Sequence, residues 1–289
     1  MSPAQTIIPG LCLISPEPEP ASAWQSPNLY LLGQDPLTLI DSGYDRESNL
    51  SAVREAVGGN RLGRIILTHA HVDHAGGAWK LREQFGAEVL LHPDEEPALS
   101  RRFPGHHPDR FFEAGEELAA GDFLLEVILV PGHAKGHAAF YLEKEGILFS
   151  GDLITGDGSS LVAPPEGNMR WYMNSLYLVQ QMPLKLILPG HGPLVTDPAR
   201  RIAELIEHRE LREICIAKCL AEQPLTLREL VRAMYLGLIH PQLEGAAAGT
   251  AWAHLEKMLE DGTVLAEPAQ EKNPFARTFR LAPGLDLPF

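Results

Sequence analysis

The chain has 289 residues, of which 45% are hydrophobic and 21% are charged. This composition is ordinary for a water-soluble globular protein, and no apolar run approaches the roughly 20 residues of a membrane-spanning helix. The formal net charge of −14 argues against a broad phosphate-binding surface. The three cysteines give no disulfide framework, and the segment 1–10 lacks the pattern of a signal peptide, so we expect a cytoplasmic protein.

Short β-type runs alternate with helical patterns from the amino terminus to about residue 196. The expected strands are 29–33, 37–41, 64–68, 87–92, 123–130, 138–143, 147–151 and 184–190. The expected helices are 46–57, 75–85 and 168–182. The first two strands, and the pair 138–143 and 147–151, are expected to form hairpins. This order of elements predicts an α/β domain over residues 1–196.

The pattern changes at about residue 197. The expected helices there are 201–222, 227–235 and 246–261, and the expected strands are 263–267 and 277–282. Thr226 and Glu229 form a capping-box pattern that opens the second helix, and Gly262 closes the third. Three helices followed by a β-ribbon are the order of a winged helix. We therefore expect a small winged-helix-like α+β domain over residues 197–289.

Four of the expected strands each end next to residues that can bind a metal ion. These residues are His69, His71, Asp73, His74, His133, Asp152 and His191. Functional side chains collect at strand ends of α/β structures, so we expect the seven to meet. Seven groups are too many for one tetrahedral zinc ion but suit two adjacent ions bridged by a carboxylate and a water. Imidazole favours zinc, with iron and manganese as alternatives.

Four motifs follow one another along the chain: THAHVDHAGG, PGH, SGD and PGHG. In this order they resemble the motifs of the metallo-β-lactamase superfamily. The earlier LIDSG is similar to that fold's usual LIDTG. The resemblance spans residues 1–196. It implies an αββα sandwich with a dinuclear metal site at one edge of the paired sheets.

The resemblance also implies a role for each residue of the motifs. The implied ligands of the first ion are His69, His71 and His133, and those of the second are Asp73, His74 and His191. Asp152 would bridge the two ions, and Asp41 would support the motif loop, with a turn aspartate as the less favoured alternative for Asp41. A metal-bridging hydroxide would attack an acyl or phosphoryl centre, with Asp73 orienting it and shuttling its proton.

The carboxylate of Asp152 narrows the choice within the family. The resemblance implies that true β-lactamases carry a cysteine near this point or lack the bridging aspartate, so antibiotic hydrolysis is disfavoured. The Asp152 pattern resembles glyoxalase II. FSGDLITGDGSS, WYMNSL and PGHGPLV, together with the carboxy-terminal domain, resemble the β-lactamase-like protein 2 branch. That branch implies RNA endonucleases in animals and thioesterases in fungi.

Three functions therefore compete. A hydrolase of small esters or thioesters leads, and a single-strand endoribonuclease is the alternative. A ligand-sensing regulator on the hydrolase fold is the third. The third carboxy-terminal helix offers nucleic acid an unfavourable surface, because Glu244, Glu256, Glu260 and Asp261 outnumber Lys257. We expect a small-molecule substrate and no membrane partner, and a homodimer is compatible with the sequence.

Two segments are candidates for substrate contacts. Arg101 and Arg102 belong to a basic segment, 100–110, which we expect to be a loop at the mouth of the site or simply a solvated loop. Arg170, Trp171 and Tyr172 end the long segment 153–172, which follows Asp152 and is expected to form the wall of the substrate site. The two aromatic residues are equally compatible with the apolar side of a helix.

Overall fold

Two β-sheets form the centre of the molecule. The computed structural model describes residues 4–16, 26–235, 240–268 and 273–284. The seven strands of the first sheet follow the order of the chain: β1 (Ala4–Ile8), β2 (Leu11–Ile14), β3 (Leu29–Leu32), β4 (Leu37–Ile40), β5 (Leu62–Ile66), β6 (Glu88–Leu91) and β7 (Arg110–Phe111). The second sheet has the order β12 (Leu186–Pro189), β11 (Ile147–Gly151), β10 (Ala138–Leu142), β9 (Phe123–Leu129) and β8 (Glu117–Ala120).

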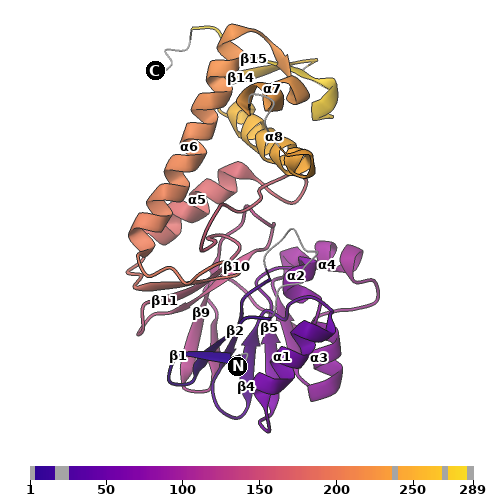
Figure 1. Ribbon diagram of the computed structural model, residues 1–289, viewed down its shortest axis with the longest axis vertical. Helices are drawn as coiled ribbons and strands as arrows, with labels where there is room; N and C mark the ends of the chain where they lie inside the picture. Colours follow the sequence, from indigo (N-terminus) through magenta and orange to yellow (C-terminus); the bar gives the residue numbers. More distant parts are fainter. Residues whose placement is uncertain (1–3, 17–25, 236–239, 269–272, 285–289) are drawn as a thin grey trace.

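Helices cover the outer faces of the two sheets (Figure 1). The helices of the sandwich are α1 (Glu47–Val57), α2 (Val72–Ala75), α3 (Ala78–Phe85), α4 (Glu96–Arg102) and α5 (Met169–Gln180). The carboxy-terminal elements are α6 (Pro198–Glu222), β13 (Leu225–Thr226), α7 (Leu227–Met234), α8 (Glu244–Glu260), β14 (Val264–Glu267) and β15 (Thr278–Leu281). Short 3₁₀ turns lie at 93–95, 241–243 and 274–276. None of the described helices has the length and apolar composition needed to cross a bilayer.

The alternation of side chains along each strand creates three cores. On β5, Ile65 packs with α1 and α3, whereas its neighbour Ile66 packs between the sheets. On β11, Phe149 lies between the sheets and Leu148 faces the opposite way, toward α5 and α6. Helices, two sheets and helices therefore form successive layers. The expected αββα sandwich is confirmed.

The expected strands and helices of the sandwich are present with small shifts at their ends, and both hairpins form. Three regions differ from expectation. The strands β1, β2, β7 and β8 have no predicted counterpart. The segment 100–110 is not entirely a loop, because Arg101 and Arg102 lie in the last turn of α4. Pro97 near the start of this helix and the glutamates around it favour a helix start. The loop was predicted from the basic residues of the segment, which outweighed this signal.

The carboxy-terminal region has the expected three helices and two strands. Thr226 and Glu229 form the predicted capping box, and β13 adds a third strand beside β15. A separate core joins these elements, built from residues of α6, α7, α8 and the small sheet. The winged-helix interpretation and the division at residues 196 and 197 stay predictions.

The inter-sheet core can be tested at Phe140. This side chain is fully buried on β10 and makes an edge-to-face contact with Phe112, with ring centroids 5.6 Å apart. We expect Phe140→Ala to lower the free energy of unfolding by about 3–5 kcal/mol, since it leaves a cavity between the sheets. Leu124→Ala is the control on β9, because Leu124 is 46% exposed. Equal midpoints in urea for the two variants would contradict the layer assignment.

Candidate metal centre

The seven side chains that the sequence predicts as metal ligands lie close together at one edge of the sandwich. His69 and His71 follow β5, and the short helix α2 carries Asp73 and His74. His133, Asp152 and His191 follow β9, β11 and β12. Among the residues that the structure describes, three overlapping groups of three have their ligand atoms within 4.8 Å of one another. The structure thus brings together all the residues that the sequence singled out as metal ligands.

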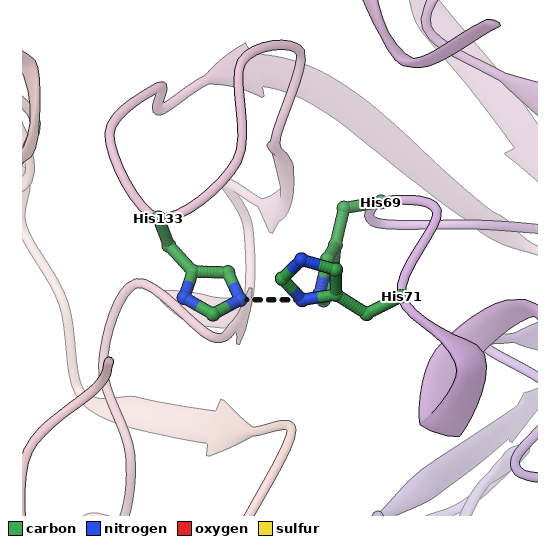
Figure 2. Close-up of side chains that lie close together, drawn as sticks. All are labelled: His69, His71 and His133. Carbon is green, nitrogen blue, oxygen red and sulfur yellow. Dashed lines mark hydrogen bonds between the residues drawn. The ribbon is translucent and has the colours of Figure 1, made fainter. Parts of the chain in front are cut away.

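The first group consists of three imidazoles. His71 Nδ1 lies 2.9 Å from His69 Nε2 and 2.9 Å from His133 Nε2. Figure 2 shows His133 approaching from one side and His69 and His71 from the other. Ligands about 2.0–2.1 Å from a tetrahedral zinc ion are roughly 3.3 Å apart, so the spacing here is close to that of a coordination sphere.

The second group combines imidazoles and carboxylates. His74 Nε2 lies 3.3 Å from His191 Nε2 and 3.9 Å from Asp73 Oδ2. His191 Nε2 lies 3.2 Å from the same oxygen of Asp73. This mixture of nitrogen and oxygen ligands suits a borderline ion such as zinc or iron.

Asp152 lies between the two groups. Its Oδ1 is 3.4 Å from His74 Nε2 and 3.6 Å from His191 Nε2, while its Oδ2 is 3.5 Å from His133 Nε2. Oδ1 is buried and accepts no hydrogen bond from the residues that the structure describes. A buried carboxylate oxygen without a partner destabilises the fold unless a cation binds it. The position of Asp152 therefore fits a bridging ligand.

The electrostatics of the centre favour bound cations. Burial lowers the pKa of His133 to about 4 and that of His69 well below its usual value, so both imidazoles are neutral ligands near pH 7. Burial opposes ionisation of Asp73, but His74 and a hydrogen bond from His191 outweigh it and lower the pKa of Asp73 to about 2. Around His74 the carboxylates outweigh burial and raise the pKa of the imidazole. The surroundings of His74 thus favour a positive charge.

Asp41 fixes the orientation of two of these histidines. Its Oδ2 accepts a hydrogen bond from His74 Nδ1 at 2.7 Å, which leaves the lone pair of His74 Nε2 directed at the centre. Asp41 also accepts from the Thr68 hydroxyl at 2.9 Å, so the hydroxyl oxygen is left to accept from His69 Nδ1 at 2.9 Å. Ser42 reinforces the same loop, since its backbone N–H and hydroxyl both donate to the carbonyl of His74.

The outer nitrogens of the other two imidazoles in the first group also have partners. His133 Nδ1 donates to the carbonyl of Leu161 at 2.7 Å. His71 Nε2 lies 3.3 Å from Glu166 Oε2, which also accepts from Arg102 at 2.6 Å. The lone pairs of His69, His71 and His133 therefore face one another. They repel unless a cation lies between them, so the centre fits a metal ion.

Two further buried residues support the ligand loops and were not predicted. Glu95 accepts from the backbone N–H of Ala70 at 2.9 Å and of Gly136 at 2.7 Å, so one carboxylate joins two ligand loops. His137 Nε2 accepts from the backbone N–H of Asp152 at 3.0 Å. The second Gly-His pair of PGHAKGH was a signal for His137. Glu95 had none, because a sequence with three acidic residues in a row resembles a solvated surface.

The glycines of the two Pro-Gly-His motifs allow close approach to the site. A Cβ atom at Gly190 would lie 2.7 Å from Asp152 Oδ1 and 2.8 Å from the ring of His74. Gly132 has a φ of +134°, and a Cβ atom there would lie 2.2 Å from the backbone nitrogen of Tyr172. The two motifs therefore combine the ligand histidine with a backbone position that only glycine fits.

A cavity of about 510 Å³ opens over the centre. It is lined by Tyr44, His71, Val72, Asp73, His133, Asp152, Thr155, Asp157, Gly158, Ser159, Ser160, Leu161 and His191. Both ligand groups contribute to this surface. The segment 155–161 forms the opposite wall, so the first half of the predicted wall segment borders the cavity. A larger and more open hollow over α3 and β6 contains none of the seven residues.

The five predicted substrate contacts do not line this cavity. Arg170 pairs with Glu260 and Asp261 at the end of α8. Trp171 is 41% exposed and borders a separate hollow with Pro131 and Leu178. Tyr172 is buried in the core behind the cavity wall, with its hydroxyl donating to Leu153.

The physical reason is the helix that begins after Asn168, whose side chain caps the backbone N–H of Trp171. The helical turn sends residues 170, 171 and 172 in three different directions. Arg101 and Arg102 both pair with Glu166, so they reach the centre only through Glu166 and His71.

Asp41 gives the sharpest test of the centre's geometry. Asp41 has a φ of +57°, which asparagine tolerates, so Asp41→Asn should preserve the backbone. An amide nitrogen opposite His74 Nδ1 would reverse the tautomer and turn an N–H toward the centre. We expect about a 10- to 100-fold loss of zinc affinity, measured by competition with a chromogenic chelator, with an unchanged circular dichroism spectrum. Unaltered affinity would contradict the role of Asp41.

Comparisons with known proteins agree with this geometry. The family model described as "Metallo-beta-lactamase superfamily" matches residues 23–191. A beta-lactamase-like protein 2 homolog from Caenorhabditis elegans is 29% identical over 268 residues, covering 90% of this chain and 85% of the relative.

Two solved structures are also similar to this chain. The metallo-beta-lactamase family protein TTHA1429 from Thermus thermophilus is 27% identical with a TM-score of 0.79, covering 96% of this chain and 100% of that structure. TTHA1623 in a di-iron-bound form is 31% identical with a TM-score of 0.52, covering 64% of this chain and 96% of that structure. Since the family model matches more than half of the sequence, the chain belongs to the metallo-β-lactamase superfamily.

Proposed function

We propose that this protein is a hydrolase that uses two divalent metal ions to cleave a small ester or thioester. One observation carries the proposal: Asp152 lies between two groups of ligand atoms, beneath a cavity of about 510 Å³. His69, His71 and His133 would hold one ion, and Asp73, His74 and His191 the other. When bound, such ions lower the pKa of a water molecule and polarise the oxygen of the bond to be cleaved.

Asp73 is the residue best placed to handle the proton of the attacking water. It lies on the cavity lining, so its carboxylate borders the space in which the attacking water would lie. The short helix α2 places Asp73 beside His74, and Asp73 Oδ2 lies 3.2 Å from His191 Nε2. An ionised carboxylate on the cavity surface can orient a water molecule and accept its proton.

The cavity lining favours an uncharged acyl group. Apart from histidine, it contains no basic side chain among the residues that the structure describes. Asp157 adds negative charge to the wall, while Tyr44, Thr155, Ser159 and Ser160 offer hydroxyl groups. Such a surface suits a polar ester or thioester better than a polyanion. For the metal, zinc is proposed first, and the di-iron form of TTHA1623 makes iron the principal alternative.

An endoribonuclease is the second candidate, because the similarity to the beta-lactamase-like protein 2 homolog extends over 90% of the chain. The acidic residues of α8 argue against it. Glu260 and Asp261 pair with Arg170, and Glu256 lies 3.4 Å from Arg277, so the few cations near the helix are already paired. A strand of RNA would find little positive charge there.

The two candidates are separated by one set of assays on the metal-loaded protein. S-acyl thioesters, lactones and single-stranded RNA are tested with the wild type, Asp73→Asn, His133→Ala and the control His107→Ala, whose side chain is 67% exposed. We expect thioester or lactone turnover that falls about 10²- to 10⁴-fold in Asp73→Asn and is retained in the control.

Two outcomes would contradict the leading proposal. The hydrolase proposal would be refuted if the wild type turned over none of the substrates, or if its turnover persisted in both site variants. RNA cleavage that both variants abolish and that weakens as salt increases would replace the esterase with the nuclease.

A further inference from the structure

Two arginines of α6 hold the wall of the cavity by its backbone carbonyls. Arg201 donates to Thr155 from Nε at 3.0 Å and to Gly158 from Nη2 at 2.6 Å. Arg209, two turns further along the same helix, donates from Nη2 to Ser160 at 2.6 Å. Hydrogen bonds from a charged donor are stronger than those between neutral groups. The wall is therefore held from outside the cavity by one helix.

Arg209 is the more informative of the two because it is buried, with 1% of its surface exposed. Its guanidinium carbon lies 4.9 Å from the centre of the Tyr172 ring, and its Nε is buried without a hydrogen bond. No carboxylate in the described part of the chain forms an ion pair with it. A buried cation with so few partners contributes little to stability, since the loss of hydration opposes the contacts made. The hydrogen bond from Arg209 to the Ser160 carbonyl is therefore the interaction that accounts for a buried arginine at this position.

The held wall is in turn bonded to two residues of the centre. The Ser160 hydroxyl donates to the carbonyl of Asp152 at 2.5 Å. The carbonyl of Leu161 accepts from His133 Nδ1 at 2.7 Å. A shift of Ser160 would therefore move the bridging carboxylate and alter the orientation of an imidazole in the first group.

The helix that carries Arg209 belongs to both parts of the molecule. Ile202 and Leu205 of α6 pack in the outer core of the sandwich, whereas Ile216 and Leu220 pack with α7, α8 and the small sheet. Figure 1 shows α6 running from the sandwich to the carboxy-terminal elements. Arg209 lies between the two cores. A shift of α6 relative to the sandwich would therefore displace the cavity wall through Arg209.

We propose that Arg209 is a positioning residue of the metal centre, which acts through Ser160 and makes the carboxy-terminal region part of the active-site structure. This proposal rests on the hydrolase function for its catalytic consequence only. Its structural consequence, an ordered wall and correctly placed ligands, does not depend on which reaction the protein catalyses.

The test compares Arg209→Met, Arg209→Lys and Ser160→Ala with the control Arg200→Met. Arg200 is on the same helix but is exposed and pairs with Glu204. Three quantities are measured: hydrogen exchange of peptides covering 155–161 in metal-free protein, zinc affinity by chelator competition, and the urea midpoint. On a substrate that is turned over, kcat and KM are measured as well.

We expect faster exchange at 155–161 in Arg209→Met, about a tenfold loss of zinc affinity, and a nearly unchanged urea midpoint. kcat should fall more than KM changes. Arg209→Lys, which keeps one donor, should restore part of the affinity. Ser160→Ala should lower the affinity with α6 undisturbed, so the proposal stays testable even if Arg209→Met fails to fold.

Wild-type exchange and zinc affinity in both Arg209→Met and Ser160→Ala would overturn the proposal. So would faster exchange throughout the chain, because it would assign Arg209 to general stability. If every substrate fails but the exchange and affinity changes occur, the hydrolase function is wrong and the positioning role stands.

Discussion

Each imidazole of the centre can direct a lone pair inward only if its other nitrogen carries the proton. Four of the five do this through a different acceptor: a carboxylate, a hydroxyl, a backbone carbonyl and a glutamate held by two arginines. Asp41 serves two of them at once, directly to His74 and through Thr68 to His69. Without these acceptors the proton of each ring would no longer be fixed on the outer nitrogen. The site would then lose the inward-directed lone pairs that can bind cations.

The ligands of the centre come from both sheets of the sandwich. β5 belongs to the first sheet, and β9, β11 and β12 belong to the second, so packing the inter-sheet core also brings the two halves of the centre together. Glu95 spans the same gap from the first half to the loop after His133. The stability of the inter-sheet core and the geometry of the site therefore depend on the same packing. Besides this core and Glu95, the carboxy-terminal helix α6 supports the site at the cavity wall.

The sequence predicted the strands that carry the site, because alternating apolar runs and the motifs after them are local signals. It also predicted which seven residues would meet, since strand ends in such folds share an edge. The directions of residues 170–172 were not predictable, because they depend on where α5 begins. Arg101 and Arg102 looked like a basic patch, but their charge is taken up by Glu166, which lies far away in the sequence. Arg209 gave no signal at all in an amphipathic helix rich in charges.

The two-ion centre is tested most directly by a crystal structure of the zinc-loaded protein with anomalous diffraction measured at the zinc edge. We predict two peaks, one on either side of Asp152. The first would be bounded by His69, His71 and His133, and the second by Asp73, His74 and His191. A single peak, or zinc bound only away from Asp152, would contradict a dinuclear centre.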